Sequence, residues 1–361
     1  MFGELPKLFD RDFAIGYFLP SAGFAAATYF LVVHFNLSSA LFEFSKESFL
    51  KDLASFGLVS LLGAIILLVA NRSLIRFLEG YWAFDLGRFF NLFEVRRYEK
   101  LIEKEEQSDI ERQKYGSDSF PQDLRNRRDE IKESKAERFP DSKHLILPTS
   151  FGNSFRAFEV YSRVMYGIDA IPGWYRLLAV IPADYRNLIG AARSKVDFWV
   201  NVCFVSSLVA AEYLITIFFL RPISYQTVFN TETLIWVPAA ALAFSYTAFR
   251  FAANAARTWG NWVKAAFDVY LPELRKKLEF GLPKDNERAR EMWENFSRAV
   301  IYRHAEFMPE KTAKASDAKT DSLKDFPAAL ERNIEHLLVF KTALELLKSD
   351  YQAKRDDADN K

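Results

Sequence analysis

Four long apolar runs separated by strongly charged stretches dominate the pattern of this chain. The runs cover residues 13–35, 53–70, 198–220 and roughly 234–249, and charged or amide side chains bound them. A bilayer core of about 30 Å needs ~20 residues of helix to cross it, and a helix satisfies its own backbone hydrogen bonds in hydrocarbon. We therefore predict an all-α membrane protein with four transmembrane helices in two hairpins.

Basic residues near the ends of these runs predict their orientation. The connection between the first two runs contains Lys46 and Lys51, and the connection between the last two contains only Arg221. The opposite ends of the runs have more basic neighbours: Lys7, Arg11, Arg72, Arg76, Arg193, Lys195, Arg250 and Arg257. Because Lys and Arg near span ends stay on the cytoplasmic side, we expect both termini and the central segment to be cytoplasmic.

The same pattern divides the chain into four parts. Residues 1–72 are predicted to form the first hairpin, 73–196 a cytoplasmic helical segment, 197–256 the second hairpin and 257–361 a cytoplasmic helical tail. Residues from about 107 to 143 carry mixed charge and two prolines, Pro121 and Pro140, which predicts a mobile loop there. The central segment and the tail together are expected to build a cytoplasmic helical domain.

The tail ends in a regular apolar stripe, called the seam here. Its members recur in steps of three and four residues, with Asn333 in the one polar place: Phe326, Leu330, Leu337, Phe340, Leu344 and Leu347. This spacing is typical of a helix that buries one face against another helix. Packing onto the cytoplasmic helices and self-association as a coiled coil both satisfy the pattern, so both remain open.

One acidic residue lies deep within the third apolar run. Glu212 follows Phe198 by fourteen residues, which is about 21 Å of helix, and ionisable groups at such depth are functional by default. Hydrogen-bonding residues at equal depth on the other runs complete a candidate intramembrane polar site: Thr28, Tyr29, Ser60, Ser245 and Tyr246. Glu212 there serves either as a structural hydrogen-bond acceptor or as part of an ion or proton pathway.

Composition and motifs narrow the chemistry. The 48 basic and 47 acidic residues give a net charge of +1, which argues against a nucleic-acid partner. One cysteine, Cys203, and four scattered histidines provide no disulfide framework and no finger-type zinc site. The chain also has no phosphate-binding glycine loop, nucleophile elbow or HExxH motif. We therefore expect no enzyme activity, with no catalytic residue, metal or cofactor.

The stretch before the third run carries a recognisable series of residues. It contains Leu147-Pro148-Thr149, Gly152-Asn153, Tyr166-Gly167-Ile168-Asp169 and Trp174. Between residues 147 and 197 the chain resembles an uncharacterised family of bacterial multi-pass membrane proteins. That family usually has Arg before the Tyr and Pro after the Trp, whereas this chain has Met165 and Tyr175. The resemblance implies a bacterial inner-membrane protein and attaches no reaction to it.

Two classes of function agree with these observations. The first is a membrane-embedded interaction or scaffold protein whose cytoplasmic surface and seam bind further copies of the chain or a cytoplasmic protein. The second is an oligomeric ion channel or transporter with Glu212 in the membrane pathway. We favour the first class for two reasons. A single intramembrane acid does not by itself indicate conduction, and half of the chain is expected to form cytoplasmic surface. The lipid bilayer and a homo-oligomer are expected partners in both.

Overall fold

All of the secondary structure in the described part of the chain is helical. The computed structural model describes residues 11–34, 49–81, 86–115, 119–220 and 231–311, where the one β-type pairing is the isolated bridge between Phe280 and Lys311. The helices are, in chain order, α1 (Arg11–Phe13), η2 (Ala14–Phe18), α2 (Leu19–His34), α3 (Phe49–Glu79), α4 (Leu86–Tyr115), α5 (Gln122–Arg138), η4 (Lys143–Leu145), α6 (Ser150–Tyr166), α7 (Ala170–Leu177), α8 (Ala183–Ile215), η5 (Thr216–Leu220), α9 (Thr231–Lys277), α10 (Asn286–Tyr302) and η6 (Ala305–Phe307).

Four stretches of these helices are long and apolar enough to cross a bilayer. They are Arg11–Val32, Leu53–Glu79, Ala183–Phe218 and Ile235–Lys277. Each contains one of the four predicted apolar runs or most of it. The prediction of an all-helical chain with four potential membrane spans is therefore confirmed.

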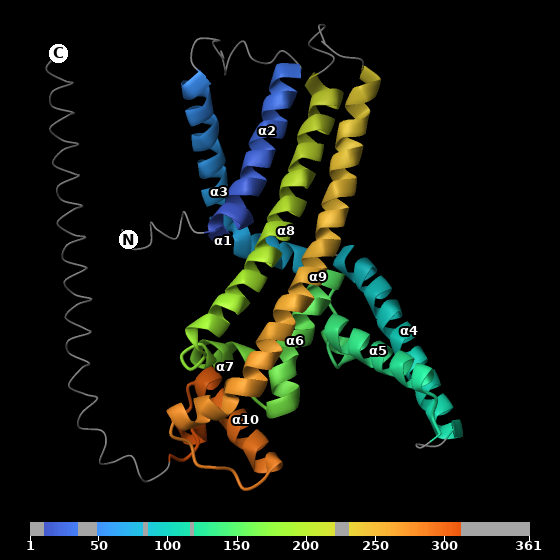
Figure 1. Ribbon diagram of the computed structural model, residues 1–361, viewed down its shortest axis with the longest axis vertical. Coiled ribbons are helices and arrows are strands. Elements are labelled where there is room, and N and C mark those ends of the chain that lie inside the picture. Colours follow the sequence, from blue (N-terminus) through green and yellow to red (C-terminus); the bar gives the residue numbers. More distant parts are fainter. Residues whose placement is uncertain (1–10, 35–48, 82–85, 116–118, 221–230, 312–361) are drawn as a thin grey trace, which may run out of the picture.

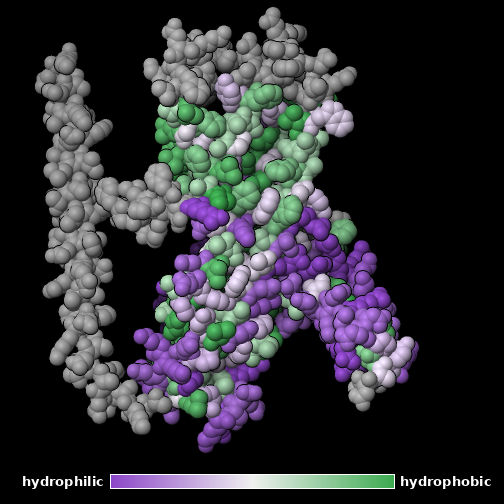
Figure 2. All heavy atoms as spheres, viewed as in Figure 1, coloured by the Kyte–Doolittle hydropathy of each residue, from purple (hydrophilic) through white to green (hydrophobic). Residues whose placement is uncertain are grey.

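The four apolar helices gather at one end of the molecule. The upper parts of α2, α3, α8 and α9 lie together there, whereas α6, α7 and α10 lie around the opposite ends of α8 and α9 (Figure 1). Hydrophobic residues cover the upper end, and hydrophilic residues cover much of the remainder, most strongly over α4 and α5 (Figure 2). With 47 residues, α9 is roughly 70 Å long, which exceeds the thickness of a bilayer core and lets one helix belong to both ends.

Small residues allow α9 to approach its neighbours closely. Ala248, Ala252 and Ala256 follow one another at four-residue spacing and are fully buried. Gly260 continues the row, and a Cβ atom there would lie 2.5 Å from Cδ1 of Phe158 on α6. Such a row on one helix face lets backbones come together, which explains why α8 and α9 form the most extensive helix pair.

A single hydrophobic core connects the two ends of the molecule. Its buried members include Phe13 and Ala64 in the upper helices, Phe155 on α6 and Phe296 on α10. At the junction, the first turn of α6 lies directly under α3, since a Cβ atom on Gly152 would be 2.4 Å from the carbonyl oxygen of Glu79. The apolar helices and the lower helices therefore pack as one body.

The charged region at residues 107–143 differs from the predicted mobile loop. Helix α4 continues to Tyr115, and α5 occupies most of the remaining region. The two helices are joined by ion pairs between acidic side chains on α4 and basic side chains on α5: Asp109 to Arg128 at 2.6 Å and Glu105 to Lys135 at 2.5 Å. The mixed charge therefore forms helix-to-helix pairs, a partnership that the sequence pattern does not show.

The predicted seam in the tail lies outside the described residues. This applies to all six of its apolar members, because the structure describes the tail only as far as Lys311. Packing of the seam onto the other helices and its self-association both stay predictions.

Candidate functional site

The predicted intramembrane acid has one of its predicted partners. Thr28 on α2 donates a hydrogen bond of 2.9 Å from its hydroxyl to a carboxylate oxygen of Glu212 on α8. Thr28 and Tyr29 also line a groove of about 350 Å³ between α2 and α3. Counting equal depth along the apolar runs therefore identified a real contact between residues 184 positions apart.

The other predicted members lie in different places. The Ser60 hydroxyl is completely buried and has no hydrogen-bond partner among the described residues. Ser245 pairs instead with α8, where its hydroxyl lies 2.8 Å from the Ser207 hydroxyl and donates to the Cys203 carbonyl at 2.9 Å. Tyr246 is 63% exposed and accepts a hydrogen bond from Arg250. The residues of the predicted intramembrane site therefore do not form one cluster. Thr28 pairs with Glu212, and Ser245 belongs to a separate contact between α8 and α9.

A buried polar network at the base of the apolar helices was not predicted as a site. Asp197 on α8 accepts hydrogen bonds from Tyr17 at 3.1 Å, from Asn71 at 3.0 Å and from Arg193 at 3.1 Å. Below it, Arg193 lies 4.7 Å from the ring centre of Trp259. The sequence signal was present, because Asn71 and Asp197 each border an apolar run on the same predicted side, but their contact requires the tertiary arrangement.

The same level of the molecule contains a basic cleft. It has a volume of about 260 Å³ and lies between α4, α5, the start of α6 and α9. Basic side chains dominate its lining: Arg97, Lys100, Lys104, Arg138, Arg250 and Arg257. Glu94 is the one acidic residue among the described lining residues. Concentrated positive charge of this kind attracts anions.

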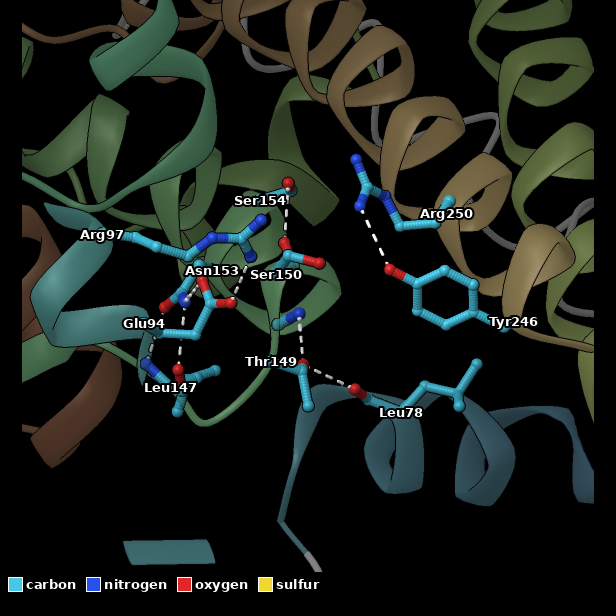
Figure 3. A network of polar contacts seen from close by, with 11 residues as sticks. Leu78, Glu94, Arg97, Leu147, Thr149, Ser150, Asn153, Ser154, Tyr246 and Arg250 are labelled. Carbon is cyan, nitrogen blue, oxygen red and sulfur yellow. Dashed lines mark hydrogen bonds and ion pairs between the residues drawn. The ribbon is translucent and has the colours of Figure 1, made fainter. Parts of the chain in front are cut away.

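Local hydrogen bonds order the wall of this cleft (Figure 3). Thr149 caps α6 by accepting a hydrogen bond from the amide of Gly152, and its hydroxyl donates to the Leu78 carbonyl at the end of α3. Asn153 bonds both backbone groups of Leu147 and donates to Glu94 at 3.3 Å. Thr149 and Asn153 thus attach α6 to α3 and α4.

An apolar groove lies at the far end from the gathered apolar helices. It has a volume of about 150 Å³, and its lining includes Trp174 from α7, Phe158 from α6 and Phe267 from α9. Ile171 and Tyr175 at its edge are 77% and 73% exposed. Exposed apolar groups clustered around a groove are typical of a protein interaction surface.

An acidic residue near this groove holds two tyrosines. Asp268 on α9 accepts hydrogen bonds from Tyr161 at 2.9 Å and from Tyr166 at 2.7 Å. Burial is the larger cause, and the hydrogen bond to Asp268 the second, of a rise in the pKa of Tyr161 to about 12. The same two causes raise the pKa of Tyr166. Both phenols therefore stay protonated at neutral pH, where they act as hydrogen-bond donors and not as bases.

The described residues contain no group of three or more His, Cys, Asp or Glu side chains arranged to hold a metal ion. No protein-family model matches the chain, and neither a curated protein nor a solved structure is significantly similar to it. Four features of this chain bear on its function: the Thr28–Glu212 pair, the Asp197 network, the basic cleft and the apolar groove.

Proposed function

We propose that this chain is a membrane-embedded interaction protein. In this proposal α2, α3, α8 and α9 cross a bacterial inner membrane as two hairpins, with both termini and the lower helices in the cytoplasm. The lower helices form a helical domain that binds a second copy of the chain or another cytoplasmic protein. The observation that carries the proposal is the apolar groove with its exposed rim of Ile171 and Tyr175.

The continuity of the molecule supports this proposal. A binding domain that must present its surface at a set distance from a membrane needs a stiff connection to the spans. Here α9 passes from the apolar end to the groove without a break, α8 packs along it, and one core includes residues from both ends. The Asp197 network adds polar contacts between α8, η2 and α3 at the junction.

A site-specific photocrosslinking experiment tests the proposal in intact cells. A photoreactive amino acid replaces Ile171 in the full chain, and a matched control carries it at Leu282, which is 78% exposed and does not line the groove. We expect protein crosslinks from position 171 that exceed those from position 282 and that Tyr175→Glu removes. Equal crosslinking at both positions contradicts the proposal.

The Thr28–Glu212 hydrogen bond favours a second function, that of an oligomeric channel or transporter. In this alternative Glu212 lines the membrane pathway and Thr28 orients its carboxyl group. Ion flux into proteoliposomes distinguishes the two functions. Flux that Glu212→Gln abolishes and Thr28→Val reduces supports a channel, whereas a chain that carries no flux while it retains its protein partner supports the interaction protein.

A further inference from the structure

The basic cleft lies where the apolar part of α9 ends. Arg250 directly follows the apolar run at 234–249, and Arg257 lies two turns further along the helix. Helices α4 and α5 contribute the facing bases, which come from positions more than a hundred residues away in the chain. If α9 spans a bilayer as proposed above, the cleft lies at the level of the lipid head groups.

Most of the bases that line this cleft have no ion-pair partner among the described residues. Glu94, the one acid of the described lining, is engaged by Arg97 at 2.8 Å and by Asn153 at 3.3 Å. Among the described residues, no carboxylate forms an ion pair with the remaining bases: Lys100, Lys104, Arg138, Arg250 and Arg257.

The bases on α5 and α9 repel one another. Burial, and then the positive charge of Arg138, lower the pKa of Arg257, and Arg250 adds to this effect, whereas Glu137 partly offsets it. The carboxylate of Glu137 also accepts a hydrogen bond from Asn261 at 2.7 Å. An anion in the cleft would be attracted by all of these bases, because they line one volume.

The start of α6 adds a further favourable element. Ser150 and Ser154, in the first two turns of this 17-residue helix, line the cleft. The N-terminal end of a helix carries partial positive charge, which favours phosphate. Thr149 already accepts the Gly152 N–H, so at α6 this charge acts on an anion in the cleft without that donor. The cleft therefore combines arginine forks, lysine ammonium groups and a helix N-terminus around one volume of about 260 Å³.

We propose that this cleft binds the phosphate group of an anionic phospholipid at the membrane surface. Arginine pairs with phosphate through two parallel hydrogen bonds, and basic clefts beside spans on the cytoplasmic side suit anionic head groups. The volume is below the range of about 300–1,000 Å³ that is usual for drug-sized ligands, which agrees with a head group. The inference rests on the membrane placement in the proposed function and is independent of the protein partner.

Native mass spectrometry of the detergent-purified full chain tests this inference. The chain is titrated with phosphatidylglycerol, and phosphatidylcholine serves as the zwitterionic comparison. The variant Arg250→Gln with Arg257→Gln removes two cleft charges. The matched control, Arg127→Gln with Arg298→Gln, removes two exposed arginines that do not line the cleft.

We expect the cleft variant to bind phosphatidylglycerol about tenfold more weakly than the wild type, because two bases near the head group are lost. The control variant should bind like the wild type. Arg250→Lys with Arg257→Lys should bind more tightly than the glutamine variant and more weakly than the wild type, because lysine keeps the charge and loses the paired hydrogen bonds. Equal binding by the cleft and control variants overturns the inference, as does equal affinity for phosphatidylcholine. If the double glutamine variant does not fold, Arg250→Gln alone is compared with Arg298→Gln, and equal binding by these two variants overturns the inference.

A second arm separates a lipid from a soluble source of phosphate. Inorganic phosphate and pyrophosphate are added at millimolar concentration to the chain with phosphatidylglycerol bound. Retention of the lipid supports the phospholipid, whereas its displacement overturns the lipid assignment. Photocrosslinking from position 171 is measured separately. Loss of lipid binding with the crosslinks retained overturns this inference alone, whereas equal crosslinking from positions 171 and 282 contradicts the proposed function.

Discussion

At the residue scale, the junction between the apolar helices and the lower helices depends on polar side chains. Asp197 is 8% exposed, and it accepts hydrogen bonds from three side chains on three different elements. A buried carboxylate is tolerated only when its partners replace the water that it loses. These partners therefore determine how η2, α3 and α8 meet.

Removal of the Asp197 carboxylate should weaken the folded state. We expect Asp197→Ala to lower stability by about 3 kcal/mol, because Arg193 and Asn71 lose their buried acceptor. Asp184→Ala, on the same helix and exposed, should cost no more than about 1 kcal/mol. Thermal unfolding in one detergent, followed by tryptophan fluorescence, measures both. Equal midpoints for the two variants would contradict the role of the network.

The tyrosines that bind Asp268 predict a loss of stability in alkaline solution. Their pKa values are higher in the folded chain than the ordinary value of 10.0, so the unfolded chain loses these protons first. The two protonated tyrosines contribute fully to the stability of the folded chain below pH 10. This contribution declines as the pH rises toward the pKa of Tyr161 in the folded chain, about 12. Tyr161→Phe with Tyr166→Phe should reduce this decline, measured as unfolding midpoint against pH.

At the element scale, close helix contacts depend on glycine in a few places. Gly152 lets α6 begin against the backbone of Glu79, and Gly260 lets α9 pass Phe158. Gly190 on α8 has no atom within 4 Å of where its Cβ would be. The same residue type therefore has a packing role at two positions and none at the third.

Alanine substitutions at Gly152 and Gly190 should change the stability of the chain in opposite directions. Gly152→Ala should destabilise the chain by about 2 kcal/mol, because a Cβ 2.4 Å from the Glu79 carbonyl oxygen forces backbone apart. Gly190→Ala should stabilise it by up to about 1 kcal/mol, since alanine is the better helix former. The midpoint of thermal unfolding reports both. A stable Gly152→Ala variant would show that α6 does not approach α3 this closely.

Helix α5 shows why charge composition misleads at this scale. Its 17 residues contain no buried side chain, which the sequence pattern associates with a mobile loop. Basic residues on one of its faces meet acids on α4, and Tyr98 packs its ring against Phe139 just after the helix. Pairing with α4, together with contacts to α6 and α9, therefore stabilises a segment that has little apolar content.

At the scale of the whole molecule, the proposed orientation predicts which surfaces are reached from each side of the membrane. In a Cys203→Ser background, Tyr175→Cys should react with an impermeant maleimide only in inverted vesicles, because its side chain is 73% exposed on the predicted cytoplasmic side. Ser39→Cys, in the connection between the first two spans, should react only in spheroplasts. Reaction of Tyr175→Cys in spheroplasts would reverse the topology.

The sequence by itself determined the helical class and the positions of the four apolar helices, because the length of an apolar run and its charged borders are local properties. Depth counting along those runs also paired Thr28 with Glu212, since helices that cross the same slab place equal depths side by side. Depth alone could not tell which helix faces meet, so it also grouped Ser245 with Glu212, although Ser245 binds α8 at Cys203 and Ser207.

Tertiary structure alone decided the polar network, the basic cleft and the pairing of α4 with α5. Asp197 meets Tyr17 across 180 positions, and the cleft unites Arg97 with Arg257. Each of these residues looks like an ordinary helix-end or surface charge in the sequence. Their chemistry depends on which charges lie close together, and that is set by the packing of helices that are distant in the chain.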